Sequence, residues 1–233
     1  LVGSEMCIRD SLLAAPLIAA PGEWHIHLDA SVAYRLQVTG DTLWCCTNGG
    51  ILLFDLRDST FTQIADGLSF VSTDVSSVAP AADGTLWAGF YGGGVVRIDD
   101  PSAPDPTAKR YGPSDGLLAD SVTAMTAIGD EIYYGSTNGV AKFFDNFHSR
   151  EPGLTDALEG VRVNDLLAIG GDTLWVATEA GVVCFNRATL SLASFDIGRV
   201  NALCVFEGRL HAAGAGGVLQ FADNVWTPYA CLL

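Results

Sequence analysis

The stretch from Asp83 to Gly94 (DGTLWAGFYGGG) decides the fold of this 233-residue chain. It places a glycine-containing turn before an apolar pair that ends in tryptophan, then small residues, two aromatic residues and a second turn made of glycines. Tight turns between antiparallel strands need positive φ angles, which glycine adopts freely. The stretch therefore predicts a strand held between two hairpin turns.

The same arrangement recurs five times. An aliphatic residue precedes an aromatic residue or histidine at Leu43-Trp44, Leu86-Trp87, Ile132-Tyr133, Leu174-Trp175 and Leu210-His211, at spacings of 43, 46, 42 and 36 residues. A valine lies 11 or 12 residues before each aromatic position, at Val32, Val75, Val122, Val163 and Val200. A glycine lies six residues beyond it, at Gly50, Gly93, Gly139, Gly181 and Gly217.

Units of this length with four predicted strands and no helical periodicity are typical of β-propeller blades. We expect an all-β chain of four-stranded antiparallel blades, a fragment of a seven-bladed or double propeller. The five predicted repeats cover residues 31–66, 74–112, 121–151, 162–196 and 199–230.

The second residue after each aromatic position is small in every repeat: Cys46, Gly89, Gly135, Ala177 and Ala213. A position that accepts only small side chains usually faces a tightly packed sheet interface. We therefore expect this position to lie where adjacent blades meet, with the neighbouring tryptophan filling the space between them.

The composition excludes several classes of function. The chain has 12 basic and 27 acidic residues, a formal net charge of −15. Nucleic-acid binding depends on Lys and Arg neutralising phosphates, so this balance argues against it and against attraction to anionic membrane surfaces. Hydrophobic residues make up 49% of the chain and charged residues 17%, which excludes disorder and favours buried strands.

The first residues differ from the repeats. Residues 1–11 (LVGSEMCIRDS) resemble a translated sequencing-adapter artefact, and we expect them to be non-native. Residues 12–21 (LLAAPLIAAP) match the end of a signal peptide with an alanine-rich cleavage site. The alternative is an ordinary buried segment. Residues 22–233 form the expected propeller, with residues 23–28 as an outer strand of a blade.

The repeats resemble the two-component regulator propeller family. Gly67-Leu68 and Val75, followed by Asp83–Gly89 and Gly92–Gly94, reproduce the pattern of that family, and the likeness covers residues 31 to 223. It implies an exported, periplasmic or extracellular propeller, as in hybrid histidine kinases or in the surface propeller of the type IX secretion system. Gly22–Leu28 (GEWHIHL) resembles the mature start of the latter group.

One face of such a propeller carries the turns after the second strands and the connections between blades, where ligands usually bind. Exposed aromatic rings together with amide and carboxylate groups suit a saccharide or a protein segment. The ligand-face candidates are Asn48, Asp74, Phe90, Tyr91, Asp120, Asn138 and Glu179. The two adjacent aromatics, Phe90 and Tyr91, are both expected to be exposed at a turn tip.

His25, His27 and Asp29 share one strand face at metal-ligand spacing, but the preferred interpretation is an exposed polar strand face. The four histidines do not converge in the sequence pattern, which weighs against a metal-dependent lyase. We expect no metal and no cofactor. Cys45 and Cys46 are interpreted as small core residues, while a disulfide involving Cys184 or Cys204 stays open.

The sequence thus favours a non-enzymatic binding or sensor propeller that recognises a glycan, a peptide or a partner protein. The alternative is a propeller-fold lyase or glycoside hydrolase. An enzyme would require a cluster of carboxylates or a metal set on one face of the ring.

Overall fold

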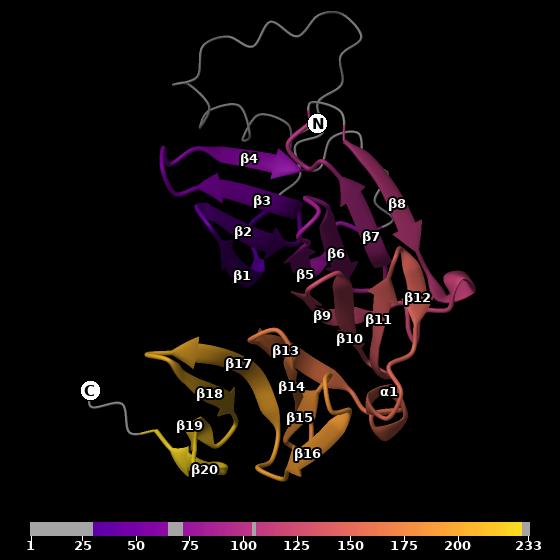
Figure 1. The fold of residues 1–233 in the computed structure, drawn as a ribbon. Helices are drawn as coiled ribbons and strands as arrows, with labels where there is room; N and C mark the ends of the chain where they lie inside the picture. Colours follow the sequence, from indigo (N-terminus) through magenta and orange to yellow (C-terminus); the bar gives the residue numbers. More distant parts are fainter. Residues whose placement is uncertain (1–29, 65–71, 104–105, 230–233) are drawn as a thin grey trace, which may run out of the picture.

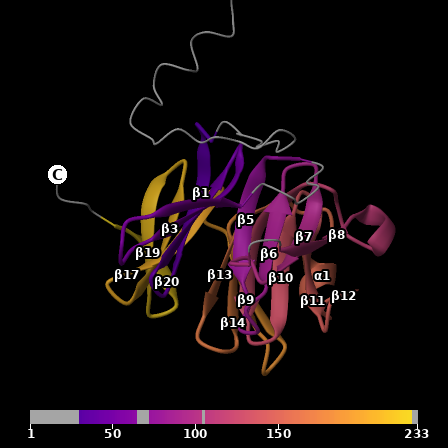
Figure 2. The same cartoon turned by 90° about the horizontal axis from the view of Figure 1, so that it is seen from above.

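A computed structural model describes residues 30–64, 72–103 and 106–229, which form five separate four-stranded antiparallel sheets. Each sheet is built from four consecutive strands, and its strand order follows the sequence. Figure 1 shows the five sheets arranged as an arc about a common axis, and Figure 2 shows the same arrangement from above. This is the predicted β-propeller architecture, and the sheets are numbered here as blades 1 to 5.

The strands have the following bounds. Blade 1 contains β1 (Ala33–Thr39), β2 (Thr42–Thr47), β3 (Gly50–Asp55) and β4 (Phe61–Ile64). Blade 2 contains β5 (Val75–Pro80), β6 (Leu86–Phe90), β7 (Gly94–Asp99) and β8 (Thr107–Tyr111). Blade 3 contains β9 (Val122–Ile128), β10 (Glu131–Ser136), β11 (Gly139–Phe144) and β12 (Phe147–Ser149).

Blade 4 contains β13 (Val163–Ile169), β14 (Thr173–Thr178), β15 (Val182–Asn186) and β16 (Ser191–Phe195). Blade 5 contains β17 (Val200–Phe206), β18 (Arg209–Gly214), β19 (Gly217–Ala222) and β20 (Val225–Pro228). Two short helical segments, the 3₁₀ turn Pro113–Asp115 and α1 (Leu154–Ala157), lie in the connections between blades. The first strands β1, β5, β9, β13 and β17 contact one another in sequence order around the axis.

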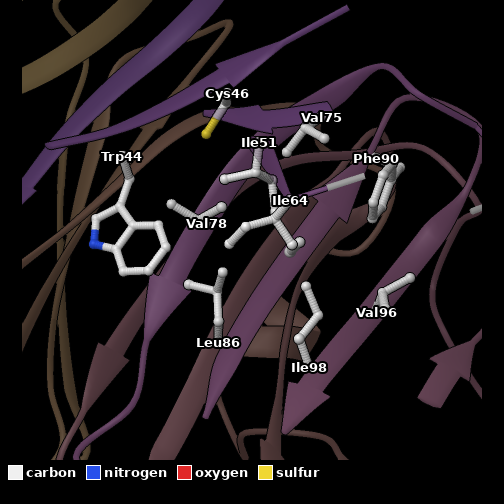
Figure 3. Packing of buried hydrophobic residues seen from close by; sticks show 11 residues of the cluster. Trp44, Cys46, Ile51, Ile64, Val75, Val78, Leu86, Phe90, Val96 and Ile98 are labelled. Atoms are coloured by element: carbon white, nitrogen blue, oxygen red, sulfur yellow. The ribbon is translucent and has the colours of Figure 1, made fainter. Parts of the chain in front are cut away.

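The core lies between the blades. Four clusters of buried apolar residues each join two consecutive blades, and Figure 3 shows the cluster between blades 1 and 2. The aromatic position is 7% exposed or less in every blade, at Trp44, Trp87, Tyr133, Trp175 and His211. In blades 1 to 4 it belongs to the cluster shared with the next blade. Apolar burial of this kind is the main favourable contribution to folding.

The small residue after the aromatic position is required by close contact with the next blade. A Cβ atom at Gly89 would lie 2.5 Å from Cγ1 of Val122, and one at Gly135 would lie 2.4 Å from Cγ1 of Val163. Both valines begin the first strand of the following blade and are fully buried. The prediction that the small position lies at a tight interface between blades is therefore confirmed.

The sequence register was wrong by one residue at two places. In blade 1, Ala33 occupies the position that Val75 occupies in blade 2, because Ala33 pairs with Thr47 as Val75 pairs with Phe90. In blade 2, the turn after the second strand is one residue longer, so the equivalent of Gly139 is Gly94. Gly94 has a φ of +74°, and a Cβ there would lie 2.2 Å from the carbonyl oxygen of Tyr111.

Blades 1 and 5 lie at the two ends of the arc (Figure 1). On blade 1, the face opposite the cluster in Figure 3 exposes apolar side chains, with Leu36 and Val38 both 61% exposed. Val78, the register equivalent of Leu36 in blade 2, is fully buried against blade 1. This face of blade 1 therefore has the apolar composition of a face that is buried in blade 2, but its side chains are exposed.

Several sequence-based expectations fall outside the described residues, including residues 1–29 with His25, His27 and Asp29. The cysteines that the structure describes, Cys45, Cys46, Cys184 and Cys204, are all free, so none of the disulfides left open among them forms. Burial raises the pKa of the Cys46 thiol to about 12, as expected of a small core residue. Within residues 30–64, 72–103 and 106–229, no helix is long and apolar enough to cross a membrane.

The contact between Gly135 and Val163 gives the first testable prediction. Gly135→Ala should lower the free energy of unfolding by about 1–3 kcal/mol, because overpacking forces the neighbouring blade to shift. Adding Val163→Ala removes the closest methyl group and should recover part of the loss. Urea denaturation of both variants measures this.

Gly171→Ala is the matched control, because a Cβ at Gly171 meets no atom within 4 Å. Equal destabilisation by Gly135→Ala and Gly171→Ala, or no recovery in the double variant, would contradict the interpretation of this contact.

Candidate functional site

The topology separates the turns of each blade onto two opposite faces. The turn between second and third strands and the connection to the next blade lie at one end of each sheet. We call this the connection face. The other two turns of each blade lie at the opposite end, here called the hairpin face. All seven ligand-face candidates belong to the connection face or to the strand ends beside it.

An exposed aromatic pair lies at the junction of blades 1 and 2 on the connection face. Tyr34 and Tyr91 are 43% and 39% exposed, and their rings meet edge to face with centroids 5.4 Å apart. The Tyr34 hydroxyl donates to Oδ1 of Asp74 over 3.1 Å. This hydrogen bond is the largest cause of the raised pKa of Tyr34, so the hydroxyl stays protonated as a donor.

Backbone contacts fix this junction. The Tyr91 N–H donates to the Asp74 carbonyl over 3.0 Å, and the Ser72 hydroxyl donates to the Tyr91 carbonyl over 3.4 Å. Asn48 lies in the neighbouring turn of blade 1, where its Oδ1 accepts the Val32 N–H over 3.0 Å, and the N–H of Gly50, the first residue of β3, donates to the carbonyl of Thr73. The structure therefore brings Asp74, Tyr91 and Tyr34 into contact, with Asn48 in the adjacent turn. We call these four residues the tyrosine cluster.

Phe90 differs from the expectation. It is 1% exposed and packs in the cluster between blades 1 and 2, as Figure 3 shows. Successive side chains of a strand point to opposite faces, so the last residue of β6 points into the interface while Tyr91 lies in the turn. The prediction of exposure is correct for Tyr91 and wrong for Phe90.

The remaining candidates lie elsewhere on the connection face and have internal partners. Asp120 pairs with Arg110 at 3.3 Å, at the junction of blades 2 and 3. The Asn138 amide donates to the Leu118 carbonyl over 3.2 Å. At the junction of blades 4 and 5, Glu179 lies 3.3 Å from Arg199 and 3.8 Å from Arg162. Asn138 and Glu179 lie in the turns of blades 3 and 4, whereas Asp120 borders the turn that carries Tyr91, since its carbonyl accepts the Gly94 N–H over 2.8 Å.

An ion pair occupies the centre of the arc. Arg35 on β1 lies 2.5 Å from Oδ1 of Asp165 on β13, and the Asp165 side chain is 4% exposed. The other Asp165 oxygen accepts the N–H of Leu203 on β17 over 2.7 Å. Equivalent positions in the other blades hold Ser77, Ala124 and Ala202, so these two charges depart from the repeat. Arg35 and Asp165 were not identified from the sequence, although a charged residue at a position that holds serine or alanine in the other repeats could have indicated them.

The largest convergence of charged groups in the described part of the chain lies between blades 3 and 4. The single proton of the Tyr133 hydroxyl is shared between two acceptors, Oε2 of Glu151 at 2.7 Å and Oε2 of Glu131 at 3.0 Å. Lys142 pairs with both carboxylates, and Arg187 of blade 4 lies 2.5 Å from Glu131. Glu131 and Glu151 are 9% and 5% exposed.

This network explains why a tyrosine replaces tryptophan in blade 3. The carboxylates supply acceptors for the buried hydroxyl, and Lys142 and Arg187 balance their charge. Burial alone would raise the pKa of Glu131, but the hydrogen bond and charge of Lys142 outweigh it and hold that pKa below its usual value. Every charged group is engaged inside the interface, so the network is a structural cross-link.

In the described residues, no group of three or more His, Cys, Asp or Glu side chains is arranged to hold a metal ion. His148 lies in β12 with its Nε2 2.8 Å from the Tyr134 hydroxyl, and His211 fills the aromatic position of blade 5. The two histidines belong to different blades.

No protein-family model and no curated protein matches this sequence. Among solved structures, the chain is similar to the extracellular domain of the putative hybrid two-component system BT4673 from B. thetaiotaomicron, with a TM-score of 0.66 and 20% identity over 84% of this chain and 27% of that one. It is also similar to PorZ, a surface component of the type IX secretion system of Porphyromonas gingivalis, with a TM-score of 0.61 and 17% identity over 86% of this chain and 26% of that one.

A β-propeller domain of Cps50 (Swd1) from Myceliophteria thermophila is similar as well, with a TM-score of 0.60 and 14% identity over 82% of this chain and 66% of that one. These likenesses at low identity establish the propeller fold. The chain spans about a quarter of the length of the BT4673 domain and of PorZ.

The central ion pair gives a second prediction. Arg35→Ala should lower the free energy of unfolding by about 1–3 kcal/mol, because it leaves a buried carboxylate with only backbone donors. Arg57→Ala is the control. It removes an ion pair to Asp55 of similar length, 2.6 Å, whose arginine is 72% exposed, and it should change stability little. Equal losses of unfolding free energy in the two variants would show that the Arg35–Asp165 ion pair contributes no more to stability than an exposed one.

The buried network gives a third prediction, on pH dependence. Because the folded-state pKa of Glu131 lies below its unfolded value, its contribution is complete above the unfolded pKa and is lost as pH falls through the folded pKa. The difference in free energy of unfolding between the wild type and Glu131→Gln should therefore be largest at neutral pH and become smaller in acid. Urea denaturation across acid to neutral pH tests this, and a gap that widens in acid would contradict it.

Proposed function

We propose that this chain is the binding propeller of an exported sensor or secretion-system protein and that it has no catalytic role. Its ligand is a glycan, a peptide or a segment of a partner protein, held on the connection face. The observation that carries the proposal is the tyrosine cluster, an exposed aromatic pair fixed by hydrogen bonds beside a carboxylate and an amide.

The geometry of the cluster suits recognition. Two rings in edge-to-face contact present a rigid apolar surface with a polar rim. Because tyrosine side chains have few rotatable bonds, little side-chain entropy is lost when they bind a ligand. Asp74 and Asn48 offer acceptors and a donor at its margin. Rigid tyrosines of this kind are common anchors in protein and saccharide recognition.

An exported location rests on two supports. The segment at residues 12–21 has the pattern of a signal-peptide end, and the similar proteins from B. thetaiotaomicron and P. gingivalis are described as an extracellular domain and a surface component. The acidic charge of −15 is consistent with that location.

The alternative, a propeller-fold lyase or glycoside hydrolase, would need carboxylates that a substrate can reach. Glu131 and Glu151 are the best candidates by proximity, but both are buried and bonded to Tyr133 and Lys142. A carboxylate pair that is buried in the interface between blades and held by lysine, arginine and tyrosine is not accessible to a substrate for proton transfer. The network therefore favours the binding function.

The proposal is tested by screening the purified chain on a glycan array and a peptide library, then measuring affinity for the hits. Tyr34→Ala and Tyr91→Ala should each weaken binding by at least about tenfold, as expected for aromatic anchors. Phe147→Ala is the control, because this ring is 73% exposed and lies on the hairpin face.

Two outcomes would overturn the proposal. The first is that every hit keeps its affinity in both tyrosine variants. The second is chemical turnover of a hit, detected by mass spectrometry after incubation with the protein, which would favour the enzyme.

A further inference from the structure

The hairpin face carries a cavity that is separate from the tyrosine cluster. It has a volume of about 340 Å³ and lies between blades 2 and 3. Its walls come from the turns β5–β6, β9–β10 and β11–β12, and its floor from Trp87, Ile132 and Phe143. This volume falls in the range of small-ligand sites, about 300–1,000 Å³.

The rim of the cavity is acidic, and two of its carboxylates have no partner. Asp83 accepts hydrogen bonds from the Thr85 N–H and hydroxyl, which lower its pKa and keep it ionised. Asp130 and Asp145 make no hydrogen bond or ion pair with any residue that the structure describes. No lysine or arginine lines the cavity.

The floor supplies an unused donor. Trp87 is 3% exposed, and its ring packs against Tyr111 and Phe143, with centroid distances of 5.6 Å and 4.7 Å. The small part of Trp87 that stays exposed borders the cavity that the residue lines. The indole N–H donates to no described residue, and its nitrogen is not among the fully buried unpaired atoms, so it is accessible where Trp87 lines the cavity.

The walls are held in place by the same aromatic residues. The Tyr111 hydroxyl donates to the carbonyl of Asn146 over 3.2 Å, which fixes the turn that carries Asp145. Asp145 and Asn146 have φ values of +49° and +64°, a left-handed pair typical of a tight hairpin turn. Phe144, 53% exposed, adds an apolar wall beside this turn.

We propose that this cavity, here called the hairpin-face pocket, binds a basic side chain of a peptide. The ammonium or guanidinium group is held by Asp130 and Asp145, its methylene chain lies along Phe144, and a peptide carbonyl accepts the Trp87 N–H. Unpaired carboxylates in a recess favour a cation over a neutral ligand, because low-dielectric walls strengthen the attraction. The carbonyl acceptor distinguishes a peptide from a simple amine.

The probe is Nα-acetyl-lysine N-methylamide, and the neutral analogue with norleucine in place of lysine is the matched comparison. Binding is followed by the indole ¹H–¹⁵N resonance of Trp87, assigned with Trp87→Phe. We expect a saturable shift with a Kd of about 1 mM or less, a weaker response as salt is raised, and no saturation with the norleucine compound.

Matched variants test the residues. Asp130→Asn and Asp145→Asn should each raise the Kd at least about fivefold, since both keep the shape and remove the charge. Asp223→Asn is the control. It changes the same kind of turn in blade 5, where Asp223 and Asn224 have φ values of +49° and +64°, but it does not line the cavity.

The proposal is overturned if the norleucine compound binds as well as the lysine compound, if Asp130→Asn and Asp145→Asn leave the Kd unchanged, or if no saturable shift occurs. None of these results bears on the tyrosine cluster, which lies on the opposite face.

Discussion

The valine that starts each of blades 2 to 5 and the small residue of the blade before it determine how closely the blades approach. Where Val122 meets Gly89 and Val163 meets Gly135, no atom beyond the glycine backbone fits between the two sheets. This contact brings the aromatic position of one blade against the apolar face of the next, and so creates the four clusters that form the core. The interior of the protein is thus a series of interfaces between sheets.

Because the strands are used to build these interfaces, the proposed binding sites lie in the turns and at the strand ends. The connection face holds a rigid aromatic cluster, and the hairpin face holds a recess with unpaired carboxylates. The two differ in chemistry because they come from different turns of the repeat. Turns vary freely in sequence as long as their glycines allow the backbone to reverse, so they are where blades of one fold acquire different ligands.

The repeat made the blades, their strands and the interface role of the small position predictable from sequence. Single-residue differences were not predictable: the longer turn in blade 2 shifts the equivalent glycine to Gly94, and Ala33 replaces the expected Val32. Phe90 was misplaced because its exposure depends on where β6 ends. Tyr34, Arg35 and Asp165 were missed because their partners lie in other blades, at separations that local patterns do not encode.

Repeat proteins whose units contact only their neighbours behave as one-dimensional systems, in which each unit can gain or lose structure with little effect on distant ones. Asp165 breaks that rule. One carboxylate contacts Arg35, 130 residues away in blade 1, and the backbone of Leu203 in blade 5, while belonging to blade 4. The two ends of the arc are therefore energetically coupled through a single side chain. Such a contact couples local opening of the first blade to local opening of the last, which contacts between neighbouring blades alone would not do.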